Sequence, residues 1–183
     1  MKKRMVCLLC FVFITIQLNA QENAAAPVKT DKISVGLGYG QDYGGLGVNL
    51  IAYPLRNIGV FGGVGYNIVG AGYNIGLKFR LISSKPTAKV TPCALAMYGY
   101  NAVIKVTGAS DLNKVFYGPT FGVGIDYKSY SRSKIFYSFA LMVPIRGEEV
   151  DEYIDDLKTN HNVEFNNELF PVTFSLGLKY ILK

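Results

Sequence analysis

Alternation of apolar and polar residues is the clearest pattern in the chain, and it is most regular in the last twelve residues, 172–183. From Val172 to Leu182 every second residue is apolar, whereas the residues between them are mostly small, hydroxylated or charged. Successive side chains of a β-strand point to opposite faces, so a period of two predicts a strand. One uninterrupted apolar face opposite a polar face is typical of a strand with hydrocarbon on one side and a polar interior on the other.

Seven earlier segments repeat this alternation, so the chain is predicted to be all-β. The eight segments cover residues 33–41, 45–55, 58–67, 71–82, 88–106, 115–128, 134–145 and 172–183. In the fifth, two interleaved apolar sets that begin at Cys93 and Ala94 compete for the outer face. Pro92 indicates a bulge that switches the alternation there.

The connections between the segments alternate in length. Residues 56–57, 83–86 and 129–133 are short, whereas residues 107–114 and 146–170 are longer, although 42–44 and 68–70 are tight turns on the same side as the long loops. Short turns on the side of both termini and longer loops opposite are expected of outer-membrane barrels. We therefore predict an eight-stranded antiparallel up-and-down transmembrane β-barrel over residues 33–183.

The N-terminal residues predict export. Lys2, Lys3 and Arg4 precede an apolar core at residues 5–16 and a short polar end at Ala20, which is the pattern of a secretory signal peptide. We expect cleavage after Ala20 and a flexible lead-in at residues 21–32. The mature chain then keeps one cysteine, so no intramolecular disulfide can form.

Composition narrows the class further. Hydrophobic residues make up 50% of the chain and charged residues 17%, yet no apolar run of about 18 residues follows the signal, which excludes a helical membrane protein. Loss of the signal lowers the formal net charge from +6 to +3. The basic charge therefore gives no reason to predict a nucleic-acid partner.

Charged residues on strands must face the interior. Lys78 and Arg80 share one face of a strand, and exposing them to lipid at mid-depth would cost roughly 2–4 kcal/mol each. Asp126 and Lys179 lie on the corresponding faces of other strands. We predict an interior charge network of Lys78, Arg80, Asp126 and Lys179 near the periplasmic end, with their desolvation offset by ion pairs.

Tyrosine and glycine fit the same geometry. Two outward aromatic girdles are predicted, one extracellular and one periplasmic, built from Tyr39, Tyr66, Tyr73, Tyr98 and Tyr117, and from Tyr53, Tyr127, Tyr137 and Tyr180. The glycine-rich stretches at residues 36–40 and 59–65 are not nucleotide-binding loops, because no helix follows them to bind a phosphate. We interpret them as inner-face positions that make room in a narrow barrel.

The long loop between Arg146 and Phe170 is the candidate surface for interaction. Val150, Ile154 and Leu157 have helical spacing, which predicts a short amphipathic helix. Six acids lie within nine residues of it: Glu148, Glu149, Asp151, Glu152, Asp155 and Asp156. They form either a solvated face or a divalent-cation site, although the EF-hand spacing is missing, and we predict no metal or cofactor.

Catalysis is not predicted, because the chain shows no Ser-His-acid arrangement. His161, the only histidine, is either a solvated loop residue or the base of an enzyme that modifies lipid A. Cys93 is interpreted as a small apolar strand residue. No catalytic residue is assigned.

The last strand carries a more specific motif. Ser175, Gly177, Tyr180 and Leu182 match the pattern polar-x-Gly-x-x-aromatic-x-hydrophobic, although Lys183 follows where a final aromatic is usual. With the signal and eight strands, the chain resembles the small outer-membrane β-barrel family that includes the OmpX and OmpA barrel domains. The signal ending Asn19-Ala20-Gln21 resembles those of Bacteroidota.

This resemblance implies a cell outer-membrane location in a Gram-negative bacterium, with outer-membrane lipid and the barrel-assembly machinery as partners. It favours a non-enzymatic barrel with a structural or surface-interaction role through its extracellular loops. The alternatives are a lipid A-modifying barrel enzyme and a soluble lipocalin-like ligand-binding barrel.

Overall fold

The structure is a computed structural model that describes residues 32–83, 88–129, 134–161, 163, 165 and 169–182. The predicted signal peptide, most of the predicted lead-in, Lys183 and parts of the turns at 83–86 and 129–133 lie outside the described residues. None of the described helices has the length and apolar character that a membrane-spanning helix requires.

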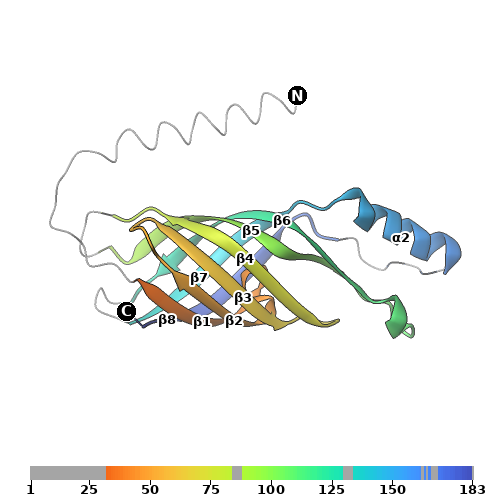
Figure 1. The fold of residues 1–183 in the computed structure, drawn as a ribbon, viewed down its shortest axis with the longest axis horizontal. Helices are drawn as coiled ribbons and strands as arrows, with labels where there is room; N and C mark the ends of the chain where they lie inside the picture. The colour runs from red at the N-terminus through yellow and green to blue at the C-terminus, as the bar shows by residue number, and fades with distance from the viewer. Residues whose placement is uncertain are drawn as a thin grey trace, which may run out of the picture.

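Eight antiparallel strands form a closed barrel (Figure 1). The strands are β1 (Ile33–Gly40), β2 (Gly45–Ala52), β3 (Ile58–Tyr66), β4 (Ala71–Arg80), β5 (Val90–Ile104), β6 (Lys114–Tyr127), β7 (Ile135–Pro144) and β8 (Thr173–Ile181). Each pairs with the next, and β8 closes on β1 with Leu178 opposite Leu37 and Gly177 opposite Gly38. The predicted eight-stranded antiparallel up-and-down barrel is confirmed, and its closure leaves no strand edge unpaired.

Side chains alternate between an apolar exterior and a largely polar interior. Leu37 and Ile75, for example, are 65% and 63% exposed on the outside, whereas Asn49, Asn74 and Thr120 are buried inside. Hydrophobic residues also fill part of the interior, in a cluster that consists of Ile51, Tyr53, Phe61, Cys93, Leu95, Met97, Ala140 and Met142. The polarity is thus the reverse of that of a water-soluble barrel.

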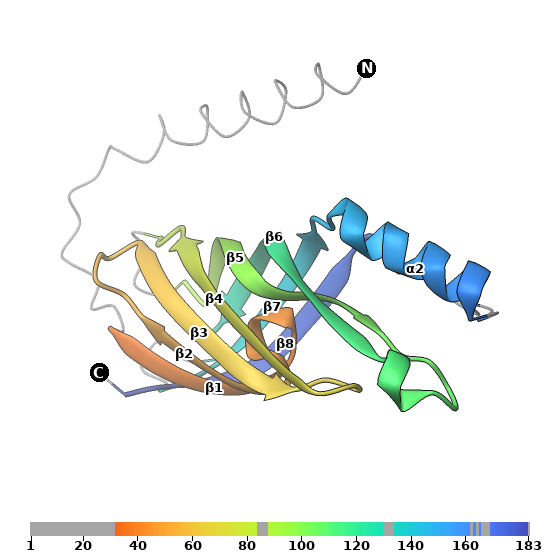
Figure 2. The same ribbon diagram turned by 45° about the vertical axis from the view of Figure 1, so that its right-hand side comes forward.

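The two ends of the barrel differ. At the terminal end, β1 begins and β8 ends, with Ser34 opposite Ile181. At the opposite end, here called the loop end, the β5–β6 hairpin extends beyond the other strands, and helix α2 (Glu148–Asn160) follows β7 (Figure 2). The short helix η2 (Ser110–Leu112) lies in the connection at the tip of that hairpin.

Helix α2 packs against the extended hairpin. Its apolar face contributes Val150 and Leu157, both buried, to a second cluster with Ala102, Ile104, Val106 and Phe116. All six acids of the candidate surface loop are exposed. The predicted amphipathic helix is therefore present, and it faces the β5–β6 hairpin.

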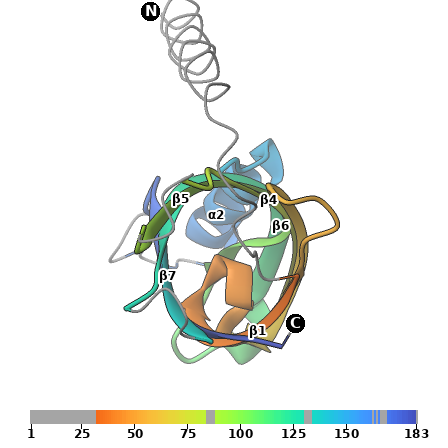
Figure 3. The same cartoon turned by 90° about the vertical axis from the view of Figure 1, so that its left-hand side faces the viewer.

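The turn predicted at residues 42–44 is wrong in form. Residues Gln41–Tyr43 form a 3-10 helix, η1, that turns back into the barrel (Figure 3, orange segment inside the ring of strands). All three of its side chains are buried. The strand prediction was also one residue too long here, because Gln41 belongs to η1.

Strand β5 contains a bulge, but it does not lie at Pro92 as predicted. The register of β5 against β6 shifts between Tyr100 and Ala102 instead. Pro92 lies opposite Ile125 of β6, and its carbonyl accepts a 2.8 Å hydrogen bond from the N–H of Leu81, which directly follows β4. Its missing N–H is tolerated because the residue lies at the end of the ladder with β4. Cys93 is buried and points inward.

The position of Tyr53 also differs from the prediction. It was predicted in the outer periplasmic girdle, but it follows the end of β2 and is buried inside the barrel. The guanidinium of Arg80 lies 3.4 Å from the centre of its ring. This contact draws the ring inward, since a cation favours the face of an aromatic ring where both are removed from water. The other predicted girdle tyrosines are exposed, except Tyr117, which is half-buried against Tyr73.

Candidate functional site

Helix η1 fills the lumen toward the loop end, and glycines make its sharp path possible. Gly40, Gly44 and Gly45 have φ of 138°, 72° and 108°, which other residues rarely adopt. The sequence from Gly40 to Gly45 can therefore leave β1, make one 3-10 turn inside the barrel and enter β2.

A row of inner-face glycines makes room for this helix. A Cβ atom added at Gly38 would lie 2.6 Å from Cζ of Tyr43, and one at Gly36 would lie 3.4 Å from its hydroxyl. A Cβ at Gly177 would overlap the same ring, and one at Gly65 would lie 2.5 Å from the Tyr43 carbonyl oxygen. The glycine-rich stretches thus make room for a specific occupant, the η1 backbone and the Tyr43 ring.

Polar side chains from several strands fix η1 in place. Nδ2 of Asn49 donates to the Asp42 carbonyl at 2.7 Å, and the Asn74 amide donates to the Gln41 carbonyl. The Ser175 hydroxyl donates to the Asp42 carboxylate. Buried backbone groups need such partners, and side chains of the barrel wall supply them here. Helix η1 is therefore a plug that the wall holds inside the lumen.

The four residues of the predicted charge network all point into the terminal half of the lumen and are buried. The structure joins two of them directly: Lys78 Nζ lies 2.7 Å from Asp126 Oδ1, with the two side chains 1% and 7% exposed. Lys179 instead donates to Oδ1 of Asn49 at 3.1 Å. Asn49, which sequence reasoning missed, therefore connects the charged residues to η1.

Arg80, the fourth member, has its own surroundings at the terminal end. Its Nε donates to the Arg56 carbonyl at 3.1 Å, and its guanidinium covers Tyr53. The carbonyl and the ring face are both electron-rich and suit a buried cation.

The four residues of the predicted assembly signal divide between the two faces of β8. Ser175 and Gly177 face the lumen and contact η1, whereas Tyr180 and Leu182 are exposed on the outside. The inner pair thus has a structural role in the folded barrel. Recognition by an assembly machine stays a prediction.

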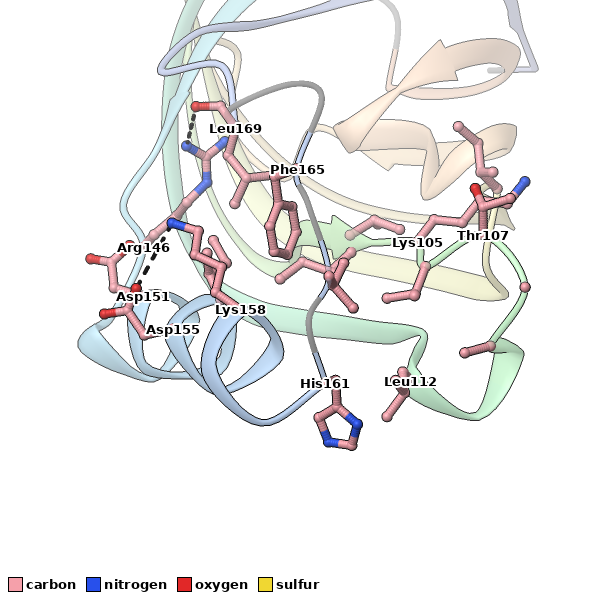
Figure 4. Close-up of a pocket in the computed structure, with 18 of the residues that line it drawn as sticks. Lys105, Thr107, Leu112, Arg146, Asp151, Asp155, Lys158, His161, Phe165 and Leu169 are labelled. Carbon is pink, nitrogen blue, oxygen red and sulfur yellow. Dashed lines mark hydrogen bonds and ion pairs between the residues drawn. The ribbon is translucent and has the colours of Figure 1, made fainter.

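A cleft of about 1470 Å³ lies at the loop end, between the β5–β6 hairpin and α2 (Figure 4). Apolar side chains from both walls line it, including Val106, Leu112, Ile154, Phe165 and Leu169. Its charged lining residues are Lys105, Arg146, Asp151, Asp155 and Lys158, and His161 also lines it. We call this space the loop cleft.

A second cavity of about 530 Å³ lies at the mouth of the barrel above η1. We call it the mouth cavity. Gln41 and Asn101 line it from the lumen, joined by a 3.0 Å hydrogen bond from Gln41 Nε2 to the Asn101 carbonyl. Ile68, Val103, Arg146, Leu169 and Phe170 line both spaces, so the two adjoin.

Arg146 stands between the two spaces. Its Nη2 donates to the Phe170 carbonyl at 2.6 Å and its Nη1 to the Leu169 carbonyl at 3.4 Å, which ties the start of the long loop to its end. Partial burial lowers the pKa of Arg146, and the carboxylate of Asp151 acts in the opposite direction. An arginine remains charged under such conditions.

The acidic residues of α2 do not converge on a common point. Within the described part of the chain, no three His, Cys, Asp or Glu residues lie close enough together to bind a metal ion. Asp155 lies 3.9 Å from Lys158, and Asp156 accepts a hydrogen bond from Asn160. His161 is exposed at the C-terminal end of α2, at the edge of the loop cleft.

No protein-family model and no curated protein sequence matches the chain. A search of solved structures found similarity to the crystal structure of the N-terminal β-barrel domain of Pseudomonas aeruginosa OprF, at 10% identity and a TM-score of 0.48. The alignment covers 82% of this chain and 98% of that chain. At this level the likeness carries no functional information.

Proposed function

We propose that this protein is an integral outer-membrane barrel without enzymatic activity, and that it acts structurally or through its loops at the cell surface. The observation that carries the proposal is the apolar exterior. Every strand exposes large apolar side chains there, among them Leu37, Leu50, Val60, Ile75, Tyr98, Val123, Leu141 and Leu176. Soluble proteins rarely expose continuous apolar surface of this extent, whereas a barrel in lipid requires it.

The orientation follows from the loops. Outer-membrane barrels have short periplasmic turns and longer extracellular loops, which makes the terminal end periplasmic and the loop end extracellular. Exposed tyrosines occur toward both ends, with Tyr39 and Tyr66 toward the loop end and Tyr137 and Tyr180 toward the terminal end. Such residues suit the two membrane interfaces. The expected signal peptide and assembly motif would bring the chain there.

The lumen argues for a role other than transport. Among the described residues, η1 and the charged side chains fill the interior, so the barrel has no open channel. The features left for interaction are the loop cleft, the exposed acidic side of α2 and the adjoining loop between Arg146 and Phe170. A surface partner would bind there.

Two cheap measurements test the membrane location. The protein should fractionate with outer membranes, and the folded barrel should migrate differently on a gel before and after boiling. Release into the periplasmic fraction would contradict the proposal. It would favour the lipocalin-like alternative, which the apolar exterior and filled lumen already count against.

Cysteine labelling of intact cells tests the orientation. Cys93 is buried and gives a low background. A membrane-impermeant maleimide should label Glu152→Cys on intact cells but label Ser129→Cys, in a terminal-end turn, only after lysis. The reverse pattern would show that the loop end faces the periplasm.

The lipid A-modifying enzyme is the alternative in another class. It needs a base near the outer leaflet, and His161 lines the loop cleft, where such a base could act. Deletion of the gene should leave the mass of lipid A unchanged if our proposal is right. A mass shift that His161→Ala reproduces would favour the enzyme.

A further inference from the structure

The mouth cavity reaches the outer face of the barrel beside the β1–β2 hairpin, where the exposed Tyr39 and Leu46 line it. The connection after Gly40 does not extend outward but turns into the lumen as η1 and returns at Gly45. The wall therefore ends early at this place, whereas the β5–β6 hairpin rises beyond it (Figure 2). A low rim of this kind joins the lumen mouth to the outside of the barrel.

The residues that line the cavity come from both sides of this rim. Its outer part is a row of exposed apolar side chains on four neighbouring strands, formed by Phe174 of β8, Tyr39 of β1, Leu46 of β2 and Tyr66 of β3. Tyr39 lies opposite Leu46, Leu46 lies opposite Tyr66, and the rings of Tyr39 and Phe174 are 6.1 Å apart. Its inner part includes the buried Gln41 and Asn101. The apolar exterior thus borders the cavity directly, with Asn67 and Thr173 as polar residues beside this row.

The charge of the mouth cavity favours an anionic ligand. Arg146 is the one charged residue among the described residues that line it. Its two hydrogen bonds to the carbonyls of Leu169 and Phe170 use part of a guanidinium that has five N–H donors. An arginine beside an apolar cavity suits an amphiphile whose head group carries a phosphate.

We propose that the mouth cavity binds one acyl chain of an anionic outer-leaflet lipid, which enters sideways over the β1–β2 rim and places its phosphate at Arg146. This inference rests on the membrane location proposed above. A volume of about 530 Å³ lies within the range of small-molecule sites. Lateral entry fits an acyl chain better than a soluble ligand, because the outer row of the cavity belongs to the surface that lipid already covers.

Tryptophan fluorescence tests the inference directly, because the chain contains no Trp. Tyr100 lines the cavity, so Tyr100→Trp places a reporter there, and Phe121→Trp on the outer face of β6 is the matched control. Each folded variant is placed in phosphatidylcholine vesicles. A fixed fraction of either dibrominated phosphatidylglycerol or dibrominated phosphatidylcholine is then included as quencher.

We expect brominated phosphatidylglycerol to quench Tyr100→Trp about threefold more effectively than brominated phosphatidylcholine, as one partly exposed ion pair provides. At Phe121→Trp the two lipids should quench equally. Adding Arg146→Gln to Tyr100→Trp should remove the preference, and adding Arg146→Lys should keep part of it. If Tyr100→Trp does not fold, Phe170→Trp at the exposed rim takes its place.

Two outcomes would overturn the inference: no quenching at the cavity reporter, or equal quenching by both lipids whether or not Arg146 is present. Failure of the membrane location would look different. In that case the control Phe121→Trp would not be quenched by either lipid.

Discussion

Toward the terminal end of the lumen, side chains from facing strands meet and fill the space, whereas toward the loop end a piece of backbone fills it. The terminal half contains the Lys78–Asp126 ion pair and the stacked Arg80 and Tyr53. The loop half contains η1, surrounded by glycines. The two halves of the lumen are thus filled in different ways, one by side chains and the other by a backbone segment.

The difference shows what each solution requires of the sequence. Side-chain filling needs long residues whose charges match, and a mismatch leaves a buried charge without compensation. Backbone filling needs the wall to lose its side chains, since a Cβ at Gly65 would lie 2.5 Å from the Tyr43 carbonyl oxygen. Each half should therefore be sensitive to a different kind of substitution, removal of a group in one and addition of a methyl in the other.

The largest effect is expected from Asp126→Ala, which leaves Lys78 buried without its partner. We expect the free energy of unfolding to fall by about 3–5 kcal/mol, measured by urea unfolding in detergent micelles. Asp156→Ala on the exposed side of α2 is the control and should change it by less than about 0.5 kcal/mol. An unchanged urea midpoint for Asp126→Ala would show that the pair contributes no stability.

Asn49→Ala tests the contact between the two halves. It removes a donor to the Asp42 carbonyl and an acceptor for Lys179 together, so we expect a loss of about 2–3 kcal/mol in the same measurement. Asn57→Ala, in an exposed turn, is the matched control. A loss no greater than that of the control would mean that the halves are independent.

Gly177→Ala tests the space that the wall leaves for the Tyr43 ring of η1, because the three atoms nearest to the added Cβ all belong to the Tyr43 side chain. We expect a loss of about 1–2 kcal/mol from overpacking, most of which should disappear in the Tyr43→Ala background. Refolding from urea avoids any part that Gly177 plays in recognition by an assembly machine. Equal losses in both backgrounds would show that the clash is not with Tyr43.

The smallest effect is expected from Tyr43→Phe. The Tyr43 hydroxyl is buried and has no hydrogen-bond partner among the described residues. Its removal should raise the free energy of unfolding by up to about 1 kcal/mol, since an unsatisfied buried hydroxyl costs stability. A decrease in urea unfolding would reveal a partner for that hydroxyl.

The strands and their outer faces could be predicted because alternation is a local property. Leu178 points outward for the same reason as its neighbours two residues away, and the inward direction of Lys179 follows from it. The partner of Lys179 could not be predicted in this way. It depends on which strand faces β8 across the lumen, and the structure selects Asn49 instead of Asp126.

The plug was not predictable from its own six residues. A segment such as Asp42-Tyr43-Gly44 favours a tight hairpin turn, and nothing local sends it inward. The features that accommodate the plug are inner-face glycines of other strands, such as Gly65 and Gly177. The space that they leave is explained only once the fold places β1, β3 and β8 around η1. The loop cleft was hidden for the same reason, because its walls come from α2 and a hairpin far from it in sequence.

The position of Tyr43 also bears on the order in which the barrel can form. Its ring lies against Gly38 of β1 and Gly177 of β8, two residues that face each other across the seam where the first and last strands meet. Since η1 connects β1 and β2, it can take its place as soon as that first hairpin forms, long before β8 is available. Pairing of β8 with β1 then closes the seam and buries the Tyr43 ring in the same step. In that step β8 packs against an η1 that the first hairpin has already positioned.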